Sequence, residues 1–253
     1  MWDRARACPP RRSAPRAPTS PVIPLSQSRS PAVELDQLAR RFGRQWPLRA
    51  VSLRVDAGEG VALLGRNGSG KTTLLRILAT TLRPTRGGGR VFGHDLRTAP
   101  EAIRERVGVL AHAPGLYADL TARENLLFAQ RMYGAPSDER SVAALLERVG
   151  LVAHAHERVR IFSAGMTRRV ALARLLLRPH DLLLLDEPFA AFDAEGIALL
   201  NEVLLEARAR GAAVIVATHD PERAAIALDR MIRIEGGVLA EAAEPLHALQ
   251  VAR

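Results

Sequence analysis

The chain has 253 residues and a net charge of +9, and because 47% of its residues are hydrophobic and 25% charged, we expect one packed α/β domain. Its apolar runs are far shorter than the roughly 18 residues that suggest a membrane span, and the only cysteine, Cys8, excludes an internal disulfide and a cysteine metal site. No apolar stretch of signal-peptide type opens the chain, so a cytosolic protein is expected.

A basic, proline-rich segment comes first. Residues 1–31 contain seven Pro and six Arg against one acid, Asp3, and so supply +5 of the net charge of +9. This composition cannot bury enough apolar surface to order itself. We therefore expect residues 1–31 to be a disordered tail, or an extension from an upstream start codon, and residues 32–253 to form the folded domain. A tether to anionic lipid or nucleic acid is the alternative for the tail.

Predicted strands lie along the rest of the chain at intervals filled by loops and helices. The predicted strands span residues 33–35, 49–55, 61–64, 104–110, 182–185 and 213–217, and a hairpin is predicted over 231–240. The glycine run 87–89 is predicted to be a loop. Short apolar runs of this kind are typical of strands buried on both faces. The pattern favours an α/β fold with a mostly parallel sheet.

The stretch from about 116 to 160 reads as helical and predicts an inserted lobe. Thr121 and Glu124 form a capping box in front of a helix over 125–132. A second helix is expected to begin at Ser137 and end at Gly150. Further helices are expected over 163–178, before Pro179, and over 194–210. The inserted helical lobe is placed at about residues 113–165.

A glycine-rich loop follows the strand 61–64 and matches the pattern G-x-x-x-x-G-K-[ST]. Its glycines let successive N–H groups point at one anion, and the helix that begins near Thr72 adds its positive dipole end. Lys71 is the only lysine among 36 Lys and Arg residues, which indicates a position that needs a compact ammonium. We expect Lys71 to reach the β- and γ-phosphates of a nucleotide and the Thr72 hydroxyl to bind Mg²⁺. The residues expected to bind nucleotide here are Gly65, Arg66, Asn67, Gly68, Ser69, Gly70, Lys71, Thr72 and Thr73.

Two carboxylates directly follow the buried strand 182–185. From a strand end beside the phosphate loop, Asp186 can bind Mg²⁺ and Glu187 can take a proton from an attacking water. A solvated acidic turn would have the same sequence, but its position beside a phosphate loop favours a hydrolytic site. The loop and the two carboxylates together still leave open a kinase, a GTPase or a motor.

Further motifs narrow this choice. Residues 162–169, Phe-Ser-Ala-Gly-Met-Thr-Arg-Arg, resemble the Leu-Ser-Gly-Gly-Gln signature of ABC-type ATPase subunits, with the serine and the second glycine kept. Segments 191–193 and 217–220 resemble two other motifs of that family, in the family's order. The resemblance covers about residues 33–240. It implies a P-loop NTPase fold with an N-terminal antiparallel β part and an inserted helical lobe.

The resemblance also implies roles for single residues outside the phosphate loop. In the family, the signature of one subunit caps the γ-phosphate of ATP held by its partner, which assigns nucleotide binding to Ser163 and Gly165; a simple helix N-cap is the plainer reading of Ser163. Asp193 falls in a second nucleotide-binding segment, and His219 is expected to act as a catalytic residue at the γ-phosphate.

Two more positions follow from the resemblance. Phe42 stands where the family has an aromatic ring against adenine, although a lone Phe is more often core. His112 replaces a family glutamine that senses Mg²⁺ or the lytic water, so we expect His112 on the metal side of the nucleotide.

The implied function is that of a transport motor that binds ATP and Mg²⁺ and hydrolyses ATP. A second ATPase subunit, expected to be an identical copy, and a transmembrane permease subunit are the implied partners, at the cytoplasmic face of the inner membrane. Residues 112–134, 168–174 and 187–189 contain segments similar to the ATPase of the haem exporter used in cytochrome c maturation.

Two alternatives remain open at this stage. A multidrug-type exporter ATPase shares much of the same sequence. A non-transport ABC ATPase that acts on nucleic acid or the ribosome is the alternative of another class. The chain contains no sustained heptads and a single ATPase unit, so no direct nucleic-acid contact is expected.

Overall fold

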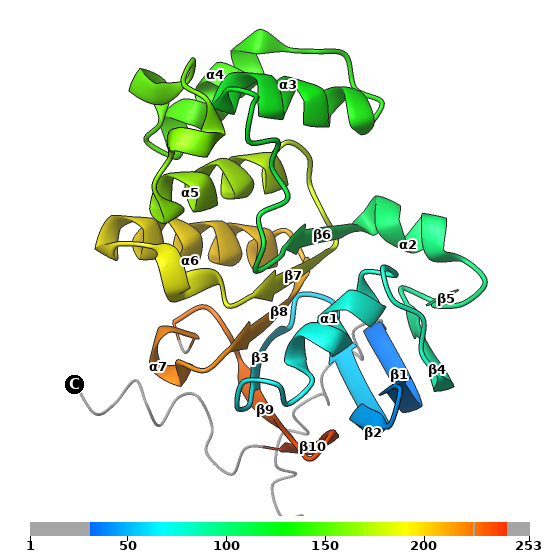
Figure 1. The fold of residues 1–253 in the computed structure, drawn as a ribbon. Coiled ribbons are helices and arrows are strands. Elements are labelled where there is room, and N and C mark those ends of the chain that lie inside the picture. The colour runs from blue at the N-terminus through cyan, green and yellow to red at the C-terminus, as the bar shows by residue number, and fades with distance from the viewer. Residues whose placement is uncertain (1–30, 225, 242–253) are drawn as a thin grey trace, which may run out of the picture.

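An antiparallel sheet forms the first part of the fold (Figure 1). The computed structural model describes residues 31–224 and 226–241, so residues 1–30 of the expected tail lie outside the described residues, whereas Pro31 already belongs to a strand. The sheet has the order β2-β1-β4-β5, and its pairs are antiparallel. Its strands are β1 (Pro31–Phe42), β2 (Gln45–Asp56), β4 (Arg86–Val91) and β5 (His94–Asp95).

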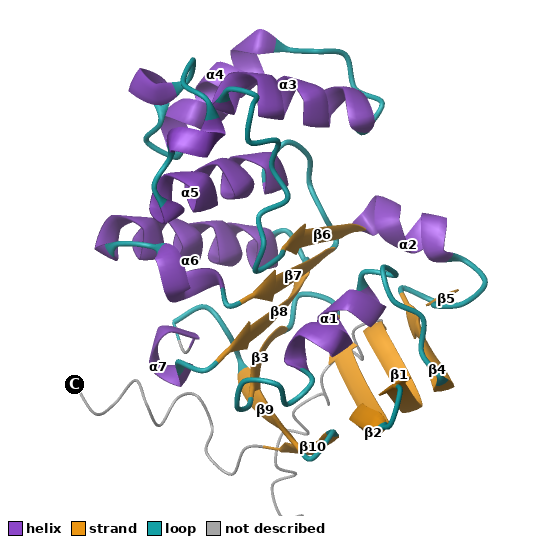
Figure 2. Ribbon diagram, viewed as in Figure 1, coloured by secondary structure: helices purple, strands orange, loops and turns teal. Residues whose placement is uncertain are grey.

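A second sheet carries the parallel strands, in the order β10-β9-β3-β8-β7-β6 (Figure 2). The β10–β9 pair is antiparallel and the other pairs are parallel. The predicted α/β fold with a mostly parallel sheet and an N-terminal antiparallel part is therefore confirmed. The strands are β3 (Gly60–Leu64), β6 (Val107–Leu110), β7 (Leu182–Asp186), β8 (Ala213–Thr218), β9 (Arg230–Glu235) and β10 (Val238–Glu241).

Both faces of this second sheet are covered, which explains why β3, β7 and β8 are buried along their whole length. On one face, α1 (Lys71–Leu78) and the antiparallel sheet share an apolar core with the strands. On the other face, α5 (Ala164–Leu175) and α6 (Ala194–Ala209) pack against the strands.

A helical lobe stands beyond α5 (Figure 1). It contains α3 (Ala122–Met132), α4 (Glu139–Arg148) and the 3-10 helices η1 (Val152–His154) and η2 (Val159–Ile161). The capping box predicted at Thr121 is present in the structure. Side chains of α5 also enter the apolar core of this lobe, so α5 packs on the lobe and on the sheet at once.

The predicted start of one helix and the predicted end of another were wrong. Helix α4 begins after Asp138 rather than at Ser137, because the Asp138 carboxylate accepts the Arg140 N–H while the Ser137 hydroxyl accepts from the Arg131 side chain. Helix α5 ends at Leu175, before the expected residue 178, because a proline at 179 disfavours helical geometry in the residue before it.

The short elements were mostly missed. Helix α2 (Pro100–Arg106) precedes β6 where the sequence analysis expected a strand from residue 104. The proline in its first turn is a signal for the start of a helix. The signal is easy to overlook because the helix is so short. The other short elements are η3 (Pro188–Ala191) and α7 (Pro221–Ala224). None of the helices in the described part of the chain has the length and apolar content that a bilayer crossing requires.

The glycine run 87–89 was expected to be a loop and instead lies within β4, paired with β1. Its glycines let the two backbones approach closely. A Cβ at Gly89 would lie 2.4 Å from the Glu34 carbonyl oxygen, whereas a Cβ at Gly88 would meet no atom within 4 Å. Gly89 is therefore the glycine of this pair that allows β4 to lie close to β1.

This difference between neighbouring glycines gives a stability test. Gly89→Ala should lower the free energy of unfolding by about 1–3 kcal/mol, because the new methyl group overlaps backbone atoms of β1. Gly88→Ala, the matched control, should change it by less than about 0.5 kcal/mol. Urea denaturation of the two variants measures the difference, and equal midpoints would contradict the close pairing.

Candidate functional site

The phosphate loop leaves the carboxyl end of β3 and enters α1, as predicted. Its glycines adopt backbone angles that other residues avoid: φ is +152° at Gly65, +79° at Gly68 and +114° at Gly70. A Cβ at Gly70 would lie 2.4 Å from the Pro47 carbonyl oxygen. Glycine is therefore required for the loop to lie against β2, and a wide turn with exposed N–H groups results.

Lys71 begins α1 and its side chain is almost completely buried, with 6% exposed. Its Nζ donates to the Gly65 carbonyl oxygen at 2.6 Å and lies 3.4 Å from Oε1 of Glu187. The ammonium thus sits inside the loop between its backbone and a carboxylate. A compact point charge suits this position, whereas a planar guanidinium would need more room.

Thr72 and Asp186 are brought together from segments far apart in the sequence. The Thr72 hydroxyl donates to Oδ2 of Asp186 at 2.8 Å, and Asp186 is 5% exposed at the end of β7. Among the described residues, no group of three or more His, Cys, Asp and Glu side chains gathers to hold a metal. Two oxygen ligands nevertheless fit Mg²⁺, which keeps several waters and takes further oxygens from phosphates.

Glu187 lies between two cationic or potentially cationic groups. Its Oε1 faces Lys71, and its Oε2 lies 2.8 Å from Nδ1 of His219. The exposed fraction is 16% for the Glu187 side chain and 67% for His219. Sequence analysis expected His219 at the γ-phosphate and Glu187 at the attacking water, but it gave no sign that the two residues contact each other. The pair can hold one carboxylate oxygen in place while the other receives a proton.

His112 lines the same cavity as the phosphate loop and the two carboxylates. This cavity has a volume of about 340 Å³ and includes residues 66–73, His112, Asp186 and Glu187. The structure thus brings His112 to the place where the sequence analysis expected it. Its role toward a metal stays a prediction.

Ser163, Gly165 and Asp193 do not line this cavity. Ser163 caps α5, with its hydroxyl accepting the Met166 N–H at 3.2 Å. Asp193 caps α6 by accepting the Gly196 N–H at 2.9 Å, and this bond, followed by the Arg169 guanidinium, holds the pKa of its carboxyl below the usual value. These residues therefore serve their own helices and remain available only to a ligand outside this cavity.

Trp46, an aromatic residue that shares a cavity with the phosphate loop, is one that sequence analysis missed. Phe42 is 45% exposed, with the Arg40 guanidinium 4.5 Å from its ring centre, and it lines neither cavity at the loop. Trp46 lines a second cavity of about 680 Å³ together with residues 65–69 of the loop. A tryptophan on the strand that contacts the loop was the available signal. The contact of Phe42 with adenine stays a prediction.

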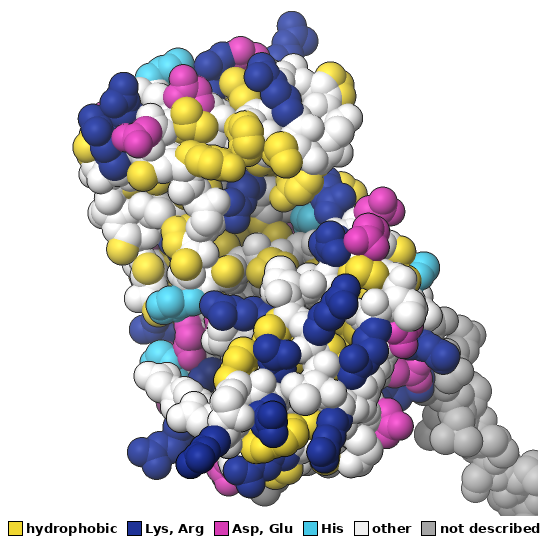
Figure 3. Space-filling view, turned by 45° about the vertical axis from the view of Figure 1, so that its right-hand side comes forward, with side chains coloured by type: hydrophobic (Ala, Val, Ile, Leu, Met, Phe, Trp, Pro, Cys, Tyr) yellow, Lys and Arg dark blue, Asp and Glu magenta, His cyan; other side chains and the backbone are white. Residues whose placement is uncertain are grey.

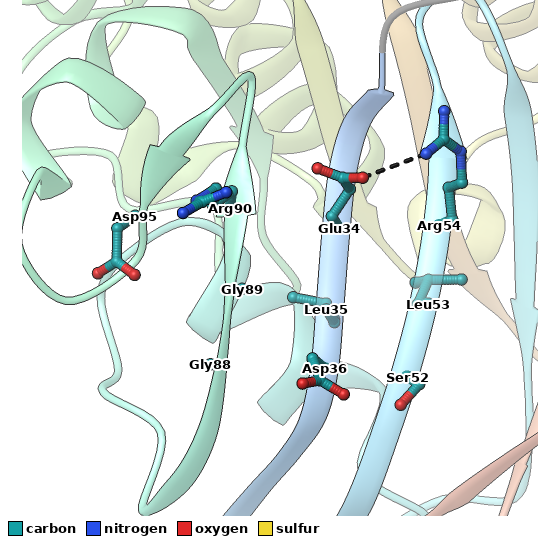
Figure 4. Close-up of a pocket in the computed structure, with 10 residues that line it drawn as sticks. All are labelled: Glu34, Leu35, Asp36, Ser52, Leu53, Arg54, Gly88, Gly89, Arg90 and Asp95. Carbon is teal, nitrogen blue, oxygen red and sulfur yellow. Dashed lines mark hydrogen bonds and ion pairs between the residues drawn. The ribbon is translucent and has the colours of Figure 1, made fainter. Parts of the chain in front are cut away.

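A larger cavity lies elsewhere and does not belong to this site. It has a volume of about 740 Å³ on the antiparallel sheet and is lined by β1, β2, β4 and Asp95 (Figure 4). Arg54 and Glu34 form an ion pair there at 3.1 Å, and the hydrogen bonds from the backbone N–H groups of Arg97 and Thr98 lower the pKa of Asp95. These features are those of a solvated sheet face.

Known proteins resemble the chain over most of its length. The family model described as ABC transporter matches residues 48–190, which is more than half of the chain. The chain is 41% identical over 191 residues to the cytochrome c biogenesis ATP-binding export protein CcmA 1 of Salmonella typhimurium, covering 75% of this chain and 90% of that protein. It is 35% identical over 212 residues to the ABC transporter ATP-binding protein NatA of Bacillus subtilis, covering 81% and 86%.

Solved structures agree with these sequence matches. The dimeric, post-hydrolysis state of the ATP-binding cassette MJ0796, bound to ADP and Pi, aligns with a TM-score of 0.73 and 26% identity. The alignment covers 83% of this chain and 98% of that one. The similarity therefore includes the whole nucleotide-binding unit of that protein.

The site predicts a separation of binding from hydrolysis. Lys71→Ala should weaken ATP binding roughly ten- to a hundredfold, because the phosphates lose their buried ammonium. Glu187→Gln should keep ATP binding and lose turnover by about 10²–10⁴-fold, because only the proton acceptor is removed. Fluorescent-nucleotide titration and phosphate release measure the two effects, with Arg76→Ala, an exposed position of α1, as the control. Normal turnover by Glu187→Gln would remove it as the base.

Proposed function

This chain belongs to the ABC transporter family as an ATP-hydrolysing subunit, and on that basis we propose that it powers a membrane exporter that serves haem delivery for cytochrome c maturation. The observation that supports haem as the cargo is the 41% identity with the cytochrome c biogenesis ATP-binding export protein CcmA 1. The match covers 90% of the length of CcmA 1. The shared length includes both the phosphate loop and the helical lobe.

The residues at the site support the following hydrolytic step. ATP places its β- and γ-phosphates on the N–H groups of residues 65–73, and Lys71 exchanges the Gly65 carbonyl and Glu187 for phosphate oxygens. Mg²⁺, held through Thr72 and Asp186, would neutralise charge that develops on the phosphates. Glu187 then accepts the proton of the attacking water while His219 fixes the orientation of its carboxylate.

A second copy of the chain would complete each site. Ser163 and Gly165 lie at the N-terminus of the twelve-residue helix α5, where free N–H groups favour an anion, and they do not line the cavity of their own subunit. The dimeric arrangement of the MJ0796 structure supports the same assembly. In the proposed homodimer, Ser163, Gly165 and Asp193 face the nucleotide held by the partner.

A groove between α3 and β6 is the proposed contact with the permease. It has a volume of about 420 Å³, and the lobe beside it gathers hydrophobic side chains (Figure 3). Met132 and Tyr117 are 69% and 55% exposed there, which is typical of an interaction site. Arg174 and Arg178 line the groove and contact backbone carbonyls. The partner segment therefore presents an apolar face and at least one carboxylate.

This partner implies a location. The ATPase would lie at the cytoplasmic face of the inner membrane and be held there through the permease. No direct contact with nucleic acid is part of this function. Haem specificity would lie in the permease, while this chain supplies the force of closure and opening.

The groove is tested by a charge placed on its rim. Met132→Glu should weaken the permease complex roughly tenfold or more, because the new carboxylate repels the partner's carboxylate and interrupts the apolar contact. Val152→Glu is the matched control, since Val152 is 60% exposed on the same lobe and outside the groove. Co-purification and the permease-stimulated ATPase rate, relative to the isolated subunit, report the effect. Equal losses in both variants would contradict the docking site.

A multidrug-type exporter is the second candidate for the transporter that this chain powers. The chain is also similar to the ABC transporter ATP-binding protein NatA, with 35% identity over 86% of that protein. The similarity is therefore not restricted to proteins of cytochrome c biogenesis, and a multidrug-type exporter is the second proposed role. The geometry of the ATP site is shared by both readings, so the distinction lies in the partner and not in the chemistry.

The cargo is tested genetically. Deletion of the gene in its host should abolish covalently bound haem in membrane c-type cytochromes, because apocytochromes would receive no haem. Wild type should restore the haem stain, and Lys71→Ala should not, since it lacks tight ATP binding. Normal c-type cytochromes together with a new drug sensitivity would contradict the haem cargo and support the multidrug exporter.

A further inference from the structure

Arg168 is a buried arginine whose side chain contacts the backbone behind Glu187 and His112. It lies on α5, five residues after Ser163, and is 5% exposed. Its Nη2 donates to the carbonyl oxygens of Asp186 and Glu187 at 2.9 and 3.0 Å. Its Nη1 donates to those of Ala111 and His112 at 2.5 and 3.2 Å. The Arg168 guanidinium thus links α5 to the segment that contains Glu187, the expected base, and to the segment that contains His112.

Glu187 has an unusual backbone at this point. Its φ and ψ angles are +47° and +53°, a left-handed conformation that costs a residue with a Cβ free energy and persists only where the surroundings hold it. Besides the contact of its own N–H with the Ala217 carbonyl, 2.8 Å away, the carbonyls on both sides of the Glu187 Cα are bonded to Arg168. The left-handed turn aims the carboxylate back at Lys71 and His219.

We propose that Arg168 is a positioning residue, which keeps Glu187 in its left-handed conformation and so aligns its carboxylate with the attacking water. The proposal rests on the proposed role of Glu187 as the base. Arg168 itself lies behind the backbone and contacts neither phosphates nor water in this role. Its planar, forked guanidinium reaches two segments at once, because Nη2 donates to the two carbonyls that flank the Glu187 Cα and Nη1 donates to those of Ala111 and His112, a span that the single ammonium of lysine cannot reproduce.

The same helix holds the rest of the segment that joins the lobes. Arg174, six residues further along α5, donates to the carbonyls of Pro114 and Gly115 at 2.8 and 2.5 Å. The backbone from 111 to 115 is therefore attached to α5 through two guanidinium groups. Arg168 and Arg174 thus connect α5 both to the backbone of Glu187 and to the segment 111–115.

The test compares Arg168 with an arginine that also holds backbone carbonyls but lies far from the site. Arg168→Met keeps the length of the stem and removes the donors, while Arg168→Lys keeps the charge and removes the fork. Arg208→Met is the control, since Arg208 donates to the carbonyls of Gly58 and Ala227 and also forms an ion pair with Asp229. kcat, KM and ATP binding are measured on the full chain with Mg²⁺, and urea denaturation verifies folding.

Arg168→Met should lower kcat by about 10²-fold, as expected when a catalytic group is misplaced by about 1 Å, with ATP binding changed less than about threefold. Arg168→Lys should lie between Arg168→Met and wild type and serves alone if the Met variant does not fold. Arg208→Met should leave kcat within about twofold. A purely structural role would instead lower urea stability in both Met variants without a selective loss of kcat.

A double variant distinguishes this inference from the proposed base. If Arg168 acts through Glu187, Arg168→Met in the Glu187→Gln background should lower the residual kcat by less than about twofold, because the group that it positions is already lost. An inactive Glu187→Gln beside a fully active Arg168→Met would overturn the role of Arg168 alone. A fully active Glu187→Gln would overturn both. An additional 10²-fold loss in the double variant would show that Arg168 acts independently of Glu187.

Discussion

Parallel pairing of β3, β8 and β7 is the constraint on which the site depends. In this register Leu64 lies opposite Thr218, and Asp186 lies opposite Ala217. The residues that follow, the phosphate loop, His219 and Glu187, consequently leave the sheet at one edge. A slip in register would displace the phosphate loop, His219 and Glu187 relative to one another.

The charged groups gathered at this edge contact one another. Lys71 binds the Gly65 carbonyl and faces Glu187, Glu187 contacts His219, and Thr72 donates to Asp186. A buried charge without such partners would be costly. The cluster therefore depends on contacts between segments that are far apart in the sequence.

Helix α5 connects this edge to the remainder of the molecule. It packs on the sheet and on the helical lobe, begins at Ser163, and sends Arg168 toward the site and Arg174 toward the groove. Desolvation lowers the pKa of both guanidinium groups, but an arginine in a protein remains protonated, so these contacts are retained at physiological pH. Helix α5 thus carries one side chain that holds the backbone of Glu187 and another that lines the groove.

The sequence by itself determined whatever depends on neighbouring residues. The phosphate loop, the strand ending in Asp186 and Glu187, and the capping box at Thr121 were predictable, because local patterns of glycine, apolar runs and caps specify them. Tertiary structure alone decided the contacts between distant segments. Whether the glycine run 87–89 forms a strand depends on β1, and the contact of Glu187 with His219 depends on β7 and β8 lying side by side. Arg168 could not be recognised as a link to Glu187, since its acceptors are backbone carbonyls, which any residue provides and no sequence pattern marks.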